Sequence, residues 1–137
     1  MTGRKYDELF THDCVVRARI SGPPMTMMST RRMEGFGDGN FSIDCFYVTH
    51  PRVFGDEPHR HSFAQYMCFF SSNPADTGEF DAEVEVCLGD EKEKYVITSP
   101  TIAYIPAGLP HGPLNFARIG RPVLFLDIAT VGSYSRL

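Results

Sequence analysis

The stretch PHRHSFAQ, residues 58–65, places two histidines and a glutamine at alternate positions of what reads as one β-strand. Successive side chains of a strand leave opposite faces of the sheet, so His59, His61 and Gln65 are expected on one face. Two imidazoles held two residues apart on a strand lie close enough to bind the same first-row transition metal. The stretch therefore predicts part of a metal site built on a sheet.

A second stretch, IPAGLPHGPLN at residues 105–115, supplies a third candidate ligand. His111 follows a turn rich in proline and glycine and begins a new run, so we expect the fold to bring it to His59 and His61. Three protein ligands leave a metal ion with positions open for water or substrate. His12 and His50 have no partner at ligand spacing, and a structural role is expected for both.

Alternation with a period of two continues through most of the chain. Strand-like runs cover residues 41–49, 63–70, 82–88, 95–98, 101–105 and 122–130, with a weaker run at 14–20. Turn signals separate these runs, among them a charged turn at 89–94, and no helical period extends beyond a turn or two. About seven short strands of this kind indicate an all-β sandwich or barrel.

The length of 137 residues suits one domain with a single core. We divide it into an N-terminal arm at residues 1–40, which is part of the same domain, and a β-barrel at 41–137. The arm carries Met25, Met27 and Met28, which would suit an adaptable contact surface. Two interpretations are open: the arm pairs with another subunit, or it is a loosely packed extension of the same barrel.

Composition favours a soluble protein with small-molecule partners. The chain is 42% hydrophobic and 22% charged, its formal net charge is -4, and its 13 basic residues are scattered, which argues against a nucleic-acid or anionic-membrane surface. No apolar run approaches a membrane span or a signal peptide. The four cysteines contain no CxxC pair, so we expect reduced thiols and a cytoplasmic protein.

The two histidine stretches together resemble the two motifs of the cupin superfamily. The first reads His59-x-His61-x-x-x-Gln65, with glutamine where most cupins carry glutamate, and the second reads Pro106-x-Gly108-x-x-His111-x-x-x-Asn115. The resemblance implies a small single-domain metal-binding cupin: a double-stranded β-helix, or jelly-roll barrel, that is usually dimeric. It also implies one divalent transition metal, Fe, Zn, Ni or Mn, bound by His59, His61, Gln65 and His111.

Gln65 has two interpretations. As a ligand, its neutral oxygen would bind the metal more weakly than a carboxylate and leave the ion more Lewis-acidic. Alternatively, its amide hydrogen-bonds a ligand histidine or a metal-bound water. On either interpretation, Gln65→Glu is predicted to bind metal at least as tightly as the parent.

Other residues near these motifs carry weaker expectations. Phe63, Met67 and Phe69 share the parity of the histidines, so they are expected to line an apolar pocket, although core filling explains them equally well. Asn115 is expected to share a face with His111 and to tie a turn through its amide. Glu83 and Glu85 alternate with apolar residues and are expected on the solvated face of their strand.

An open three-histidine site suggests catalysis. We expect a metalloenzyme that acts on a small organic molecule, of oxygenase, isomerase, lyase or decarboxylase type. The alternative is a non-catalytic cupin module that holds a small ligand or a metal. In either case we expect a homodimer that binds neither nucleic acid nor membrane.

Overall fold

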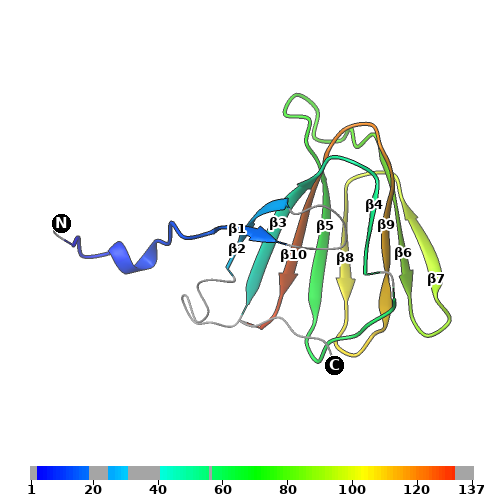
Figure 1. The fold of residues 1–137 in the computed structure, drawn as a ribbon, viewed down its shortest axis with the longest axis horizontal. Coiled ribbons are helices and arrows are strands. Elements are labelled where there is room, and N and C mark those ends of the chain that lie inside the picture. Colours follow the sequence, from blue (N-terminus) through cyan, green and yellow to red (C-terminus); the bar gives the residue numbers. More distant parts are fainter. Residues whose placement is uncertain (1–2, 19–24, 31–40, 56, 132–137) are drawn as a thin grey trace.

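Two antiparallel β-sheets face each other across the core (Figure 1). The computed structural model describes residues 3–18, 25–30, 41–55 and 57–131. Every pairing between neighbouring strands in these ranges is antiparallel. The predicted all-β class is therefore confirmed.

The larger sheet has six strands in the order β1-β2-β3-β10-β5-β8. Its strands are β1 (Val15–Ala18), β2 (Met25–Ser29), β3 (Ser42–Val48), β10 (Val123–Ala129), β5 (Gln65–Ser71) and β8 (Thr101–Ile105). The smaller sheet has four strands in the order β4-β9-β6-β7. Its strands are β4 (Arg52–Phe54), β9 (His111–Ile119), β6 (Ala82–Leu88) and β7 (Glu93–Ile97), and a 3-10 helix, η1 (Asp7–Leu9), precedes β1.

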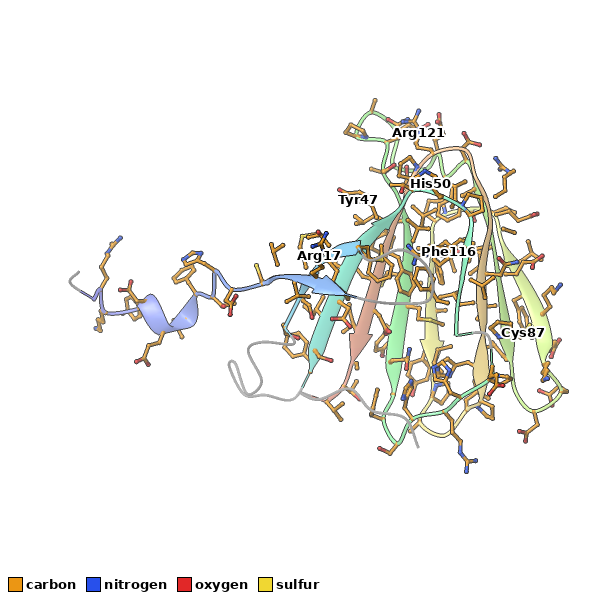
Figure 2. All side chains as sticks on the ribbon, viewed as in Figure 1. Arg17, Tyr47, His50, Cys87, Phe116 and Arg121 are labelled. Carbon is orange, nitrogen blue, oxygen red and sulfur yellow. The ribbon has the colours of Figure 1, made fainter. Side chains whose placement is uncertain are left out.

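Aromatic rings fill the core between the two sheets. Phe116 on β9, labelled in Figure 2, is fully buried, and its ring centroid lies 5.4 Å from that of Phe54, 6.1 Å from Phe69 and 5.8 Å from Phe125. Phe54 comes from the smaller sheet, whereas Phe69 and Phe125 come from the larger one. Burial of these rings therefore holds the two sheets against each other.

The expected continuous strand over residues 58–65 is wrong. β5 begins only at Gln65, the chain bends at 62–63, and His59 makes an isolated bridge to His111. Burial still alternates, since His61, Phe63 and Gln65 are buried. The sequence pattern thus gave the inward parity correctly although the hydrogen-bonded strand starts later.

Residues assigned to the N-terminal arm contribute to the larger sheet. β1 pairs with β2, and β2 pairs with β3 at Met28 opposite Cys45. Residues 3–14 project away from the barrel (Figure 1). Residues 19–24 and 31–40 of this arm lie outside the described residues.

All four cysteines are free thiols. Burial raises the pKa of the Cys45 thiol and of the Cys68 thiol, and the negative charge of Asp127 raises the pKa of Cys68 further. Within the described ranges, no helix combines the length and the apolar character that crossing a bilayer requires.

Candidate metal centre

Three histidines from two separate stretches of the sequence meet at one end of the barrel. The ligand atoms of His59, His61 and His111 all lie within 4.8 Å of one another. Their ring centroids are 5.0 Å apart for His59 and His61, 4.4 Å for His59 and His111, and 5.3 Å for His61 and His111. Three converging imidazoles could hold a single metal ion.

Backbone hydrogen bonds bring the two histidine motifs together. The His59 N–H donates to the His111 carbonyl at 3.0 Å, and the His111 N–H donates back at 2.9 Å. The Gly108 N–H donates to the His61 carbonyl at 2.8 Å, so all three histidines are fixed by main-chain contacts between the motifs. Such contacts set the spacing of the rings before any ligand binds.

Gly112 permits this close approach. Its φ is 108°, and a Cβ placed there would lie 3.3 Å from the Glu57 carbonyl oxygen and 3.6 Å from that of Gly55. Because glycine adopts positive φ without a steric penalty, the chain can pass close to the first motif just after His111.

Contacts around the rings fix their orientation. The Nδ1 of His111 lies 3.1 Å from the Leu109 carbonyl oxygen, to which an Nδ1–H donates, and this tautomer places the lone pair on Nε2. The Phe63 ring stacks on His61 with the centroids 4.7 Å apart and the planes 17° apart. His61 and His111 are 2% and 4% exposed, whereas His59 is half-buried.

Gln65 lies at the start of β5 and is 1% exposed. Its Nε2 donates to Asp127 Oδ1 at 3.2 Å. Its Oε1 is buried and accepts no hydrogen bond from the described residues. A buried carbonyl oxygen of this kind suits a cation or a hydrogen-bond donor from a bound molecule.

A cavity of about 190 Å³ adjoins the histidines. Its polar wall contains Asp44, His59, Gln65, His111 and Asp127. Its apolar wall contains Met27, Phe46, Phe54, Met67, Val86, Leu114 and Phe125. Of the three residues expected in the pocket, Met67 lines this cavity, Phe63 stacks on His61, and Phe69 lies in the aromatic core.

Sequence reasoning missed Asp44 and Asp127. They are opposite each other in the β3-β10 register, and both line the cavity. Asp44 accepts a short hydrogen bond from the Ser29 hydroxyl. The available signal was parity: Asp44 lies two residues from the buried Phe46, and Asp127 two residues from the buried Phe125, so each carboxylate shares the inward face of its strand.

The expected face of Asn115 is also corrected. Between the pairs Val86–Leu114 and Leu88–His111, β9 uses one more residue than β6, which is a β-bulge. The bulge reverses the alternation, so His111 and Leu114 are both buried while Asn115 lies on the other face. There its Nδ2 donates to Glu85 Oε1 at 3.1 Å and ties two strands rather than a turn.

No protein-family model matches the sequence, and no curated protein matches it. Solved structures do match. A structure of Bacillus subtilis oxalate decarboxylase from work on its Mn(II) centres has a TM-score of 0.58 and 15% identity, over 92% of this chain and 30% of that chain. The same enzyme at pH 4.6 gives a TM-score of 0.57 and 17% identity, over 92% of this chain and 29% of that chain. The chain has the cupin fold.

This cupin domain spans about 30% of the length of the decarboxylase chain. At 15–17% identity the likeness establishes the fold and not the reaction. The likeness therefore gives this chain a cupin-like fold, and its three-histidine cluster is a possible metal site.

Proposed function

We propose that this cupin is a small metalloenzyme that binds one divalent transition metal, Fe, Zn, Ni or Mn, and acts on a small organic molecule. The observation that carries the proposal is the meeting of three imidazoles and a buried amide oxygen beside one cavity. His59, His61 and His111 would hold the ion, and Gln65 Oε1 would be the fourth protein ligand. These nitrogen and oxygen donors suit first-row divalent metals.

The four proposed protein ligands are all neutral, and this determines the chemistry that a bound ion can support. When bound, an ion with neutral imidazole and amide ligands keeps its full positive charge and polarises an oxygen of the substrate. The buried surroundings of His61, His111 and Gln65 limit access of water to that charge. Phe63 holds the His61 ring by stacking, and the Leu109 carbonyl holds the His111 ring.

The cavity limits the size of the substrate. About 190 Å³ is comparable to a cavity of roughly 150 Å³ that holds one benzene molecule. The cavity is also lined by apolar side chains, with Phe46, Met67 and Phe125 among them. We therefore propose a substrate of few non-hydrogen atoms, with one metal-binding polar group and an apolar remainder.

The first prediction concerns metal content. Protein purified without chelators should contain close to one divalent metal per chain, and His61→Ala and His111→Ala should each lose it, because the remaining ligands no longer surround the ion. His50→Ala is the matched control, since His50 (labelled in Figure 2) is exposed and follows β3 at the end of the larger sheet opposite to Gln65. Elemental analysis measures all four proteins, and full occupancy in both site variants would refute the metal site.

Catalysis is tested separately. The metal-loaded protein is screened for oxygen uptake and product formation with small carbonyl, hydroxy-acid and thiol compounds, with His61→Ala as the blank. Turnover that depends on His61 supports the enzyme. Tight metal binding without turnover of any compound would favour the non-catalytic module instead.

A further inference from the structure

The side chain of Gln65 is fixed at its amide nitrogen, and its buried amide oxygen accepts no hydrogen bond from the described residues. The amide nitrogen donates to Asp127 Oδ1 at 3.2 Å, and the residue lines the cavity together with His59 and His111. Asp127 lies on β10, diagonally across from Gln65 on the inner face, because Gln65 is opposite Ala129 in the β5-β10 register.

The hydrogen-bonding chemistry of Asp127 and Gln65 determines the orientation of the Gln65 amide. An ionised carboxylate only accepts hydrogen bonds, whereas a glutamine amide has a donating nitrogen and an accepting oxygen. The nitrogen must therefore face Asp127, and the oxygen is left for the cavity. A glutamine without such a partner could turn its amide over and present N–H groups, which cannot bind a cation.

We infer that Asp127 is a positioning residue that holds the Gln65 amide so that its oxygen is available to the metal. The inference rests on the proposed metal site. Asp127 acts through a specific hydrogen bond to Gln65, and not only through its negative charge.

Asp44 provides the matched comparison. It lies opposite Asp127 in the β3-β10 register, lines the same cavity and carries the same charge. Asp44, however, accepts a hydrogen bond from the Ser29 hydroxyl, whereas the Gln65 amide donates to Asp127. Removing either carboxylate takes one negative charge from the cavity, but only the loss of Asp127 removes the contact with Gln65.

The same contact changes the expectation for Gln65→Glu. The sequence alone predicts metal binding at least as tight as in the parent. In the structure, a glutamate at this position would place a second carboxylate against Asp127, and like charges in contact repel. Exchanging both residues, as Gln65→Glu with Asp127→Asn, keeps one carboxylate and one amide in the pair and reverses the direction of the hydrogen bond.

The experiment measures Zn²⁺ affinity by competition with a chelator at fixed pH. Asp127→Leu should bind Zn²⁺ about 10- to 100-fold more weakly than Asp44→Leu. Gln65→Glu with Asp127→Asn should bind on the order of tenfold more tightly than Gln65→Glu alone. Equal affinities for the two leucine variants, or tighter binding by Gln65→Glu alone than by the exchanged pair, would overturn the inference. If Asp127→Leu does not fold, the comparison of Gln65→Glu alone with the exchanged pair still tests the inference.

A measurement on metal-free protein separates this inference from the proposed function. The side-chain amide protons of Gln65, observed by NMR after chelation, should exchange slowly in the parent and in Asp44→Leu and quickly in Asp127→Leu. Failure of the parent to bind Zn²⁺ would refute the metal site but leave this exchange pattern intact. The same exchange rate in all three proteins would refute the role of Asp127.

Discussion

At the scale of single residues, Gly112 couples chain geometry to the candidate site. It follows His111 directly and has a φ of 108°, with the carbonyl oxygens of Glu57 and Gly55, just before the first motif, close by. We predict that Gly112→Ala lowers the free energy of unfolding by about 1–3 kcal/mol, because alanine is strained at this φ and its methyl group meets the Glu57 carbonyl. Denaturant unfolding measures the change.

Gly108→Ala is the control for that prediction. Gly108 also has a positive φ, of 83°, but nothing lies within 4 Å of an added Cβ. Its replacement should therefore cost only the backbone strain, about 1 kcal/mol. Equal destabilisation by the two variants would mean that the approach of Gly112 to the first motif is not tight.

The candidate ligands could be predicted from the sequence because the signals that identify them lie within short stretches of the chain. The spacing of His59 and His61, together with a proline- and glycine-rich turn before His111, predicts both motifs without any knowledge of the fold. Asp127 could not be assigned in this way. Its importance depends on a contact with Gln65 between strands that are far apart in the sequence, and only the β5-β10 register shows that contact.

At the scale of elements, β9 joins the candidate site to the core. His111 begins the strand, and Phe116 occupies its centre with no exposed surface and with ring contacts to both sheets. We predict that Phe116→Ala lowers the free energy of unfolding by about 3–5 kcal/mol, because it leaves a cavity that the surrounding rings cannot fill.

Val96→Ala on β7 is the matched control, since Val96 is 51% exposed. It should change the free energy of unfolding by about 0.5 kcal/mol or less. Denaturant unfolding followed by fluorescence or circular dichroism measures both variants. A loss below about 1 kcal/mol for Phe116→Ala would show that β9 does not hold the two sheets together.

Strand prediction succeeded where alternation was long and failed where local signals conflicted. Residues 82–88 and 101–105 were predicted with the bounds that β6 and β8 have. β4 was missed because its three residues stand between Pro51 and Gly55, which read as turn signals. The bulge in β9 was missed because a one-residue offset appears only when the partner strand is known.

At the scale of the whole molecule, the outer face of the larger sheet is apolar across four neighbouring strands. Its residues are Ile43, Cys45 and Tyr47 on β3, Leu124, Leu126 and Ile128 on β10, Tyr66, Cys68 and Phe70 on β5, and Ile102 and Tyr104 on β8. Tyr47, Ile102 and Tyr104 are each more than half exposed. Monomeric proteins rarely leave a continuous apolar face of this extent uncovered.

The N-terminal residues favour a second copy of the chain as the partner of this face. Residues 3–14 leave the barrel at the β1 edge of the same sheet and project away from it (Figure 1). Tyr6, Leu9 and Phe10 are each at least 60% exposed there. They do not cover their own sheet, whereas a second copy would bury both the apolar face and these side chains.

We therefore predict a homodimer formed through the outer face of the larger sheet. Light scattering at micromolar concentration should give twice the chain mass of 15.4 kDa, and Ile102→Lys with Tyr104→Lys should give the monomer mass, because buried lysines would face the apolar surface of the partner. Val96→Lys, on the exposed β7 of the smaller sheet, should leave the dimer intact. A monomer mass for the parent protein would contradict the prediction.

The position of the three histidines gives a bound ion a mechanical role as well as a chemical one. His61 lies just before the bend that leads into β5 of the larger sheet, while His111 opens the smaller sheet at β9, so one ion would cross-link the two halves of the barrel much as a disulfide would. Such a link is present only in the folded chain, and at a free metal concentration one hundred times its Kd it adds about 2.7 kcal/mol to the free energy of unfolding. Chelation should accordingly lower the Tm and speed amide exchange in β5 and β9 before it affects β7, and a Tm independent of metal would show that no ion bridges the sheets.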